Sequence, residues 1–130
     1  MSPMQQIFLG LGAVAKKTFI DDVFSTFLYK GNDSSITVNN SLDLSTEGGL
    51  VWVKNRTTSY GNFLFDTERG TTTALSSNLT NANFSESKGV TSFNANGFTI
   101  GGSGGDSAFN SSSHDYASWT FRKAPGFFDV

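Results

Sequence analysis

The sequence predicts an all-β fold, an antiparallel jelly-roll sandwich preceded by a short N-terminal segment that is helical or extended. The 130 residues suffice for one domain with a single core. Aromatic residues, which fit pleated surfaces, make up 14% of the chain, and 13 of them are Phe. Short apolar runs separated by Gly, Asn and Ser recur about every 8–12 residues, a spacing typical of a sandwich. We therefore expect a β core built largely from Phe.

The clearest strand signal is at residues 50–54, where Leu, Val and Trp occupy both faces. Such a strand is predicted to be covered on both sides. Residues 117–122 alternate apolar and polar side chains, which predicts a half-buried strand. An Asn-Gly pair at 96–97 predicts a hairpin turn. The remaining strands are expected at residues 23–30, 36–38, 62–65, 73–77, 90–93 and 98–100.

Three segments are expected along the chain. Residues 1–20 form a separate apolar leader, and residues 21–124 form the β domain. Residues 125–130 begin with a Pro-Gly break and then start a new apolar run, which is typical of the start of a linker or a further domain.

The leader has the spacing of a short amphipathic helix. It is too short to be stable alone in water, and a membrane-spanning helix needs about 20 apolar residues. The two lysines that follow it reverse the charge order of a signal peptide. An apolar stripe of this kind needs a docking surface, either on its own β domain or on another protein, and we favour another protein. The stripe consists of Met4, Ile7, Phe8 and Leu11.

The composition argues against several partners and cofactors. The net charge is −2, and Lys and Arg are scattered, so no footprint for nucleic acid or an anionic membrane is expected. The absence of cysteine excludes disulfides, thiolate zinc sites and cysteine nucleophiles. The glycine-rich run at residues 101–105 lacks the lysine of a phosphate-binding loop. We expect no cofactor.

No residue is assigned a catalytic role. His114 is the only histidine and has no partner motif. Asp66 and Glu68 lie at i and i+2, which places both carboxylates on one face of an extended segment. A glycosidase needs two such groups, but Arg69 neutralises either acid, so we read the segment as a strand ending in a charged turn.

No metal site is assigned either. Loop oxygens of Asp33, Asp106 and Asn110 are ligand types that calcium accepts, but no EF-hand spacing is present.

Two tyrosines are candidates for stacking on sugar rings, whose apolar faces suit aromatic side chains. Tyr60 and Tyr116 lie beside predicted loops, and Asn62 and Asn78 are candidate partners for sugar hydroxyls. These four residues are the candidate glycan contacts, and the other aromatic residues are expected in the core.

Several ordered motifs carry a resemblance to a known family. They are GLVWVKNR at 49–56, FLFDTERG at 63–70, LSSN at 75–78, VTSFNANGF at 90–98 and YASWTFRKA at 116–124. Residues 23–130 resemble the concanavalin A-like (lectin or laminin-G-type) domains of tail-fibre and other virion proteins of bacteriophages.

This resemblance implies an antiparallel sandwich, a homo-oligomer with a trimer favoured, and a location in the phage tail. Residues 1–20 would then dock on another virion tail protein, an adaptor or nozzle. The expected function is that of a structural component of the virion, the N-terminal region of a tail fibre that supports host adsorption. The alternative is a carbohydrate-binding module that contacts host-surface glycans. The resemblance transfers no sugar-binding residue to this chain and implies no enzymatic activity.

Overall fold

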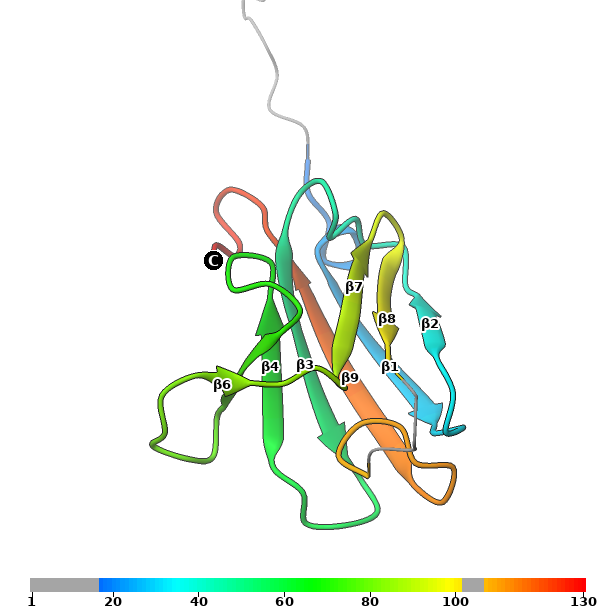
Figure 1. The fold of residues 1–130 in the computed structure, drawn as a ribbon. Helices are drawn as coiled ribbons and strands as arrows, with labels where there is room; N and C mark the ends of the chain where they lie inside the picture. Colours follow the sequence, from blue (N-terminus) through cyan, green and yellow to red (C-terminus); the bar gives the residue numbers. More distant parts are fainter. Residues whose placement is uncertain (1–16, 102–106) are drawn as a thin grey trace, which may run out of the picture.

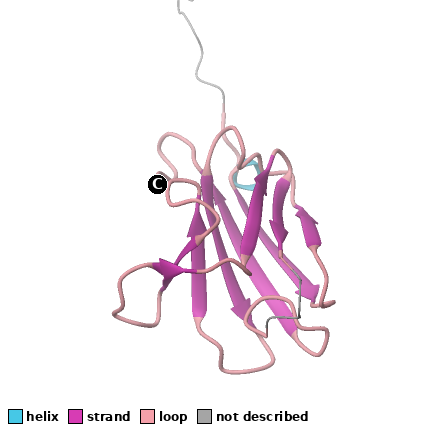
Figure 2. Cartoon of the chain, in the orientation of Figure 1, coloured by secondary structure: helices cyan, strands magenta, loops and turns pink. Residues whose placement is uncertain are grey.

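The computed structural model describes residues 17–101 and 107–130. A six-stranded sheet packs on a three-stranded sheet, and every strand pair is antiparallel (Figures 1 and 2). This confirms the expected all-β antiparallel sandwich. The stripe of the leader lies outside the described residues. The strands are β1 (Phe24–Lys30), β2 (Ile36–Asn39), β3 (Gly49–Asn55), β4 (Asn62–Asp66), β5 (Thr73–Ser76), β6 (Phe84–Ser85), β7 (Val90–Asn94), β8 (Gly97–Ile100) and β9 (Asp115–Arg122), after a 3-10 turn at Ile20–Asp22.

The order of strands brings the two ends of the domain together. The larger sheet runs β1-β9-β3-β4-β5-β6 and the smaller sheet runs β2-β8-β7. The last strand, β9, therefore lies between β1 and β3 (Figure 1). Its register places Ala117 beside Leu28 and Trp119 beside Trp52. The centre of the larger sheet thus forms only when residues far apart in sequence meet.

The core lies between the two sheets. Of the 13 phenylalanines, Phe65, Phe98 and Phe109 have no exposed surface in this structure. Valines from both sheets and two tyrosines join these three rings, and four partly buried phenylalanines pack against the cluster. The buried cluster consists of Tyr29, Val38, Leu44, Val51, Val53, Phe65, Ala74, Val90, Phe98, Ile100, Ala108, Phe109 and Tyr116.

The alternation predicted for β9 is present, but its polar side chains face the core. Ser118 and Thr120 are fully buried, whereas Trp119 is half-buried on the opposite face. The Ser118 hydroxyl donates to the carbonyl of Phe27 at 3.3 Å, and the Thr120 hydroxyl accepts from Asn40 Nδ2 at 3.0 Å. Because these partners satisfy the hydroxyls, burying them costs little.

Within the described residues, the prediction that β3 is covered on both sides is wrong. Val51 and Val53 face the core and are fully buried. Leu50 and Trp52, which point the other way, are only half-buried. Within residues 17–101 and 107–130 the strands form only these two sheets, and no third layer covers the outer face of the larger one.

Candidate functional site

A buried amide organises the end of the sandwich where β3 stops and β9 begins. Asn55 is 1% exposed. Its Oδ1 accepts from the backbone N–H groups of Thr57 and Thr58, at 2.8 and 3.0 Å. Its Nδ2 donates to the carbonyl of Ser107 at 2.5 Å and lies 3.0 Å from His114 Nδ1. An amide nitrogen only donates, so Nδ1 of His114 is the acceptor in this contact.

Tyr116 belongs to this buried network, so its prediction as a glycan contact is wrong. Its ring has no exposed surface and stacks on Tyr29, with centroids 5.1 Å apart. Its hydroxyl donates to the carbonyl of Ser107 and accepts from the N–H of Ser111, each at 2.9 Å. Burial, with a smaller contribution from Tyr116, raises the pKa of Tyr29 far above its ordinary value. The tyrosine pair therefore holds the loop before β9 onto the core.

The other three candidate glycan contacts lie together near the same end of the larger sheet. Asn78 Oδ1 accepts from the backbone N–H of Asn62 at 2.8 Å and from the Ser76 hydroxyl at 3.0 Å. Asn62 Oδ1 accepts from Trp52 Nε1 at 3.0 Å. Both asparagines thus use their side-chain oxygens within the protein. Tyr60 is 44% exposed, which leaves its ring open to a ligand.

Asp66 and Glu68 lie where β4 ends in a charged turn, as the sequence predicts. Asp66 is 1% exposed, ends β4 and forms an ion pair with Arg69. Its Oδ1 also accepts from the backbone N–H groups of Glu68 and Arg69, at 3.1 and 2.8 Å. The Glu68 side chain is exposed. Asp66 is therefore an internal cap of the turn that follows β4.

The loop oxygens considered for calcium are also used internally. Asp33 Oδ1 accepts from the N–H of Ser112 at 3.0 Å, and hydrogen bonding to Ser112 lowers the pKa of Asp33. Asn110 is fully buried and accepts from the N–H of Asn32 at 2.9 Å. Asp106 lies outside the described residues. In the described part of the chain, no three His, Cys, Asp or Glu side chains gather to hold a metal ion.

Sequence reasoning missed Asn55 and considered Asn110 only as a calcium ligand, although both are buried asparagines that organise loops. Each bridges segments that are distant in sequence. Asn55 contacts Ser107 and His114, and Asn110 donates to the carbonyls of Ser34 and Gly101. Asn is abundant in this chain, so no local pattern distinguishes these two from exposed ones. Only the pairing of distant loops gives them their roles.

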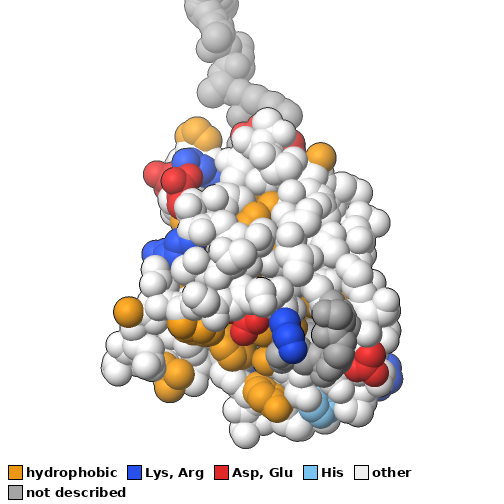
Figure 3. Space-filling model, viewed as in Figure 1, with side chains coloured by type: hydrophobic (Ala, Val, Ile, Leu, Met, Phe, Trp, Pro, Cys, Tyr) orange, Lys and Arg blue, Asp and Glu red, His pale blue; other side chains and the backbone are white. Residues whose placement is uncertain are grey.

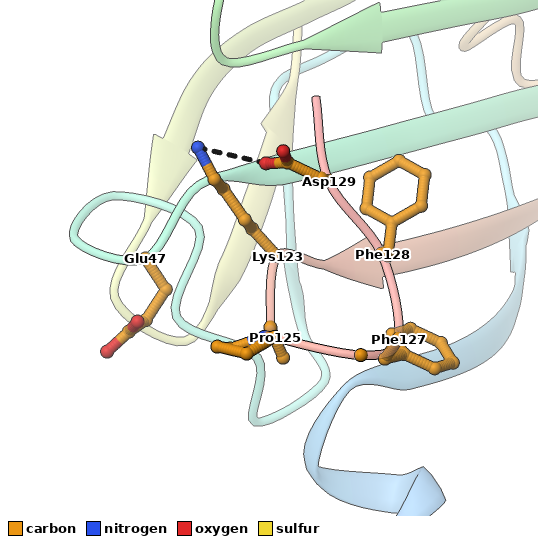
Figure 4. Close-up of a pocket in the computed structure, with 8 residues that line it drawn as sticks. Glu47, Lys123, Pro125, Phe127, Phe128 and Asp129 are labelled. Atoms are coloured by element: carbon orange, nitrogen blue, oxygen red, sulfur yellow. Dashed lines mark ion pairs between the residues drawn. The ribbon is translucent and has the colours of Figure 1, made fainter.

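A shallow pocket of about 550 Å³ lies where the chain folds back after β9 (Figure 4). Residues 125–130, which are expected to begin a linker or a further domain, contain a turn in which the Phe127 N–H donates to the Ala124 carbonyl at 3.1 Å. Phe128 packs on Phe121, with ring centroids 5.5 Å apart. Lys123 pairs with Asp129 at 3.2 Å across the pocket (Figure 4). The pocket brings together one exposed ion pair and two rings, without a convergent set of polar groups.

A further apolar feature is the outer face of the larger sheet, which points away from the smaller sheet. Trp52 and Trp119 lie side by side at its centre, with ring centroids 5.0 Å apart. The strand register places further apolar side chains on the same face. We call this set the outer band. It consists of Phe24, Leu28, Leu50, Trp52, Leu64, Leu75, Trp119 and Phe121.

The face of the smaller sheet differs from the outer band. Figure 3 shows this side of the molecule, with scattered charged side chains and small separate groups of hydrophobic ones.

Among the described residues, no helix is long and apolar enough to cross a membrane.

Comparison with known proteins identifies a family but no activity. No curated protein matches the chain, and no solved structure matches it. The model of one family, described as a domain of unknown function (DUF7483), matches residues 20–127. This match spans all the strands described above, from β1 to β9. The chain therefore belongs to the DUF7483 family.

Proposed function

We propose that this chain is a structural module of a phage virion, the N-terminal region of a tail fibre that supports host adsorption. In this proposal residues 1–20 dock on another tail protein, an adaptor or nozzle, through the stripe defined above. The β domain supplies stiffness and contacts between subunits. The observation that carries the proposal is the outer band, an apolar face on the larger sheet.

The outer band supports an assembly role because a protein acting alone rarely keeps such a face. Antiparallel sheets with one solvated face normally alternate apolar and polar residues. Here Leu50 and Trp52 of β3 lie beside Trp119 and Phe121 of β9, all half-buried. Contiguous exposed apolar surface typically marks a protein contact, and tryptophan is enriched at such contacts.

The polar residues favour a structural role for the β domain. Asn55, Asn62 and Asn78 direct their side-chain oxygens to groups of the protein itself. Asp66 caps a turn and pairs with Arg69. These side chains therefore hold loops in place. The resemblance to virion domains supports the same reading.

Cross-linking within purified phage particles tests the proposal. We expect the chain to be present in the particles, and we expect a lysine-reactive reagent to join Lys17, next to the stripe, to a second tail protein. Lys88, in the exposed loop before β7, is the matched control and should give fewer links to that protein. Absence of the chain from particles, or links confined to the chain itself, would contradict the proposal.

A lectin role is the second candidate, and the exposure of Tyr60 favours it. A ring that is 44% exposed near a loop offers a stacking platform for a sugar. Our structural proposal predicts no signal when the full chain is applied to a glycan array. Binding that is lost on Tyr60→Ala and retained on Phe127→Ala, an exposed ring at the opposite end of β3, would instead establish the lectin role.

A further inference from the structure

The edge of β1 is free in the described structure. β1 is the last strand on its side of the larger sheet and pairs only with β9. It runs for seven residues without Pro or Gly and carries one charge, Lys30, at its end. Natural sheets usually protect such edges with charges, prolines or bulges. On β1, by contrast, Leu28 is 64% exposed.

The register shows which backbone groups point to this free edge. The N–H of Arg122 donates to the carbonyl of Val23 at 2.7 Å, and Phe24 lies opposite Phe121. In an antiparallel ladder, this makes residues 23, 25, 27 and 29 the ones that bond to β9. Residues 24, 26, 28 and 30 therefore direct their N–H and C=O groups outward. Their side chains share a face with the outer band.

The edge is complementary to itself in one antiparallel register. When Thr26 lies opposite Thr26 of a second copy, Phe24 lies opposite Leu28. Lys30 then faces the end of the 3-10 turn that precedes β1 of the second copy, where Asp22 lies. Two-fold symmetry makes the contacts of Phe24 and of Lys30 twice, and Thr26 meets Thr26 once on the axis. A shift by two residues loses this match, because it places Phe24 opposite Lys30 or opposite Thr26. Asp22, Lys30 and Thr26 are all exposed in the single chain.

We propose that β1 pairs antiparallel with β1 of a second copy of this chain, centred on Thr26. The two six-stranded sheets then become one continuous sheet, and their outer bands meet across the pair. Leu28 becomes covered by Phe24 of the second copy. This pairing closes at two copies, so it differs from the trimer that the resemblance implies. It also stands independently of the virion assignment, because the purified chain tests it.

Single-cysteine variants of the full chain locate the contact, since the natural chain has no cysteine. Directly opposed, hydrogen-bonded residues have Cα atoms about 5.5 Å apart, within the range that a disulfide bridges. We expect Thr26→Cys to form a covalent dimer on mild oxidation. Ser77→Cys, at an exposed position after β5, is the matched control and should form no covalent dimer under the same oxidation. Equal cross-linking of the two variants would overturn the proposal.

A charge exchange tests the register. Lys30→Asp places like charges together at both ends of the pair, so the dimer dissociation constant should rise about tenfold by analytical ultracentrifugation. The double variant Asp22→Lys/Lys30→Asp should restore it. Sedimentation of the natural chain as a monomer or trimer, or failure of the double variant to recover, would overturn the proposal. Circular dichroism of each variant verifies that the β domain is folded.

Discussion

Replacing Asn55 with alanine is expected to lower the free energy of unfolding by about 3 kcal/mol, because it leaves several buried groups without partners. The side chain makes four polar contacts, with Thr57, Thr58, Ser107 and His114. Each backbone group left unsatisfied in a buried site costs about 1–3 kcal/mol, and water entering the vacated space offsets part of the sum.

Urea denaturation followed by tryptophan fluorescence measures this change. Asn55→Asp is an informative companion, since it keeps the acceptor for Thr57 and Thr58 but sets an oxygen against the Ser107 carbonyl and buries a charge, so it should destabilise the domain at least as much as alanine does. Asn81→Ala, in an exposed loop, is the control and should change stability by less than about 0.5 kcal/mol. A loss below about 1 kcal/mol for Asn55→Ala would show that the amide does not organise the loops.

The strands were predictable because their signals are local. β3 is a continuous apolar run, and the hairpin of β7 and β8 has Asn-Gly at its turn. Both occur where the pattern places them. The short strand β6, Phe84–Ser85, was not expected, because two residues carry no periodicity and β6 exists only through its pairing with β5.

Which face of a strand is buried was less predictable. Apolar periodicity identifies the two faces of β9 but does not say which one the second sheet covers. Thr120 is buried because Asn40, 80 residues away in sequence, provides its partner. The same limit applies to Tyr116, whose position beside a polar loop favoured exposure. Its hydroxyl instead reaches the backbone of Ser107 and Ser111.

The candidate glycan site was predictable only in part. Asn62 and Asn78 do lie together, as a shared role requires, but their contact is a hydrogen bond between side chain and backbone that fixes the start of β4. The residue types that bind sugars can be read from the sequence. That Asn62 and Asn78 already use their side-chain oxygens in hydrogen bonds within the protein cannot. Tyr60 keeps an exposed ring, and Asn78 is also exposed although its Oδ1 is used within the protein.

Deletion of residues 2–15 is expected to abolish incorporation of the chain into phage particles while the β domain remains folded. The deleted segment contains the whole stripe of Met4, Ile7, Phe8 and Leu11. Among the described residues the strands and the core begin at β1 and Val23, so we expect circular dichroism and thermal unfolding to be nearly unchanged. The loss should therefore be one of attachment rather than of folding.

A matched pair of full-length variants separates the stripe from the length of the leader. Ile7→Ser/Phe8→Ser removes two members of the stripe and should reduce incorporation as the deletion does. Gln5→Ser/Gln6→Ser changes neighbouring residues outside the stripe and should leave incorporation unchanged. The measurement is the amount of chain per purified particle by quantitative mass spectrometry. Loss with the deletion and with the stripe variant is the result that we predict, and normal incorporation of the deletion variant would contradict the tail-docking role.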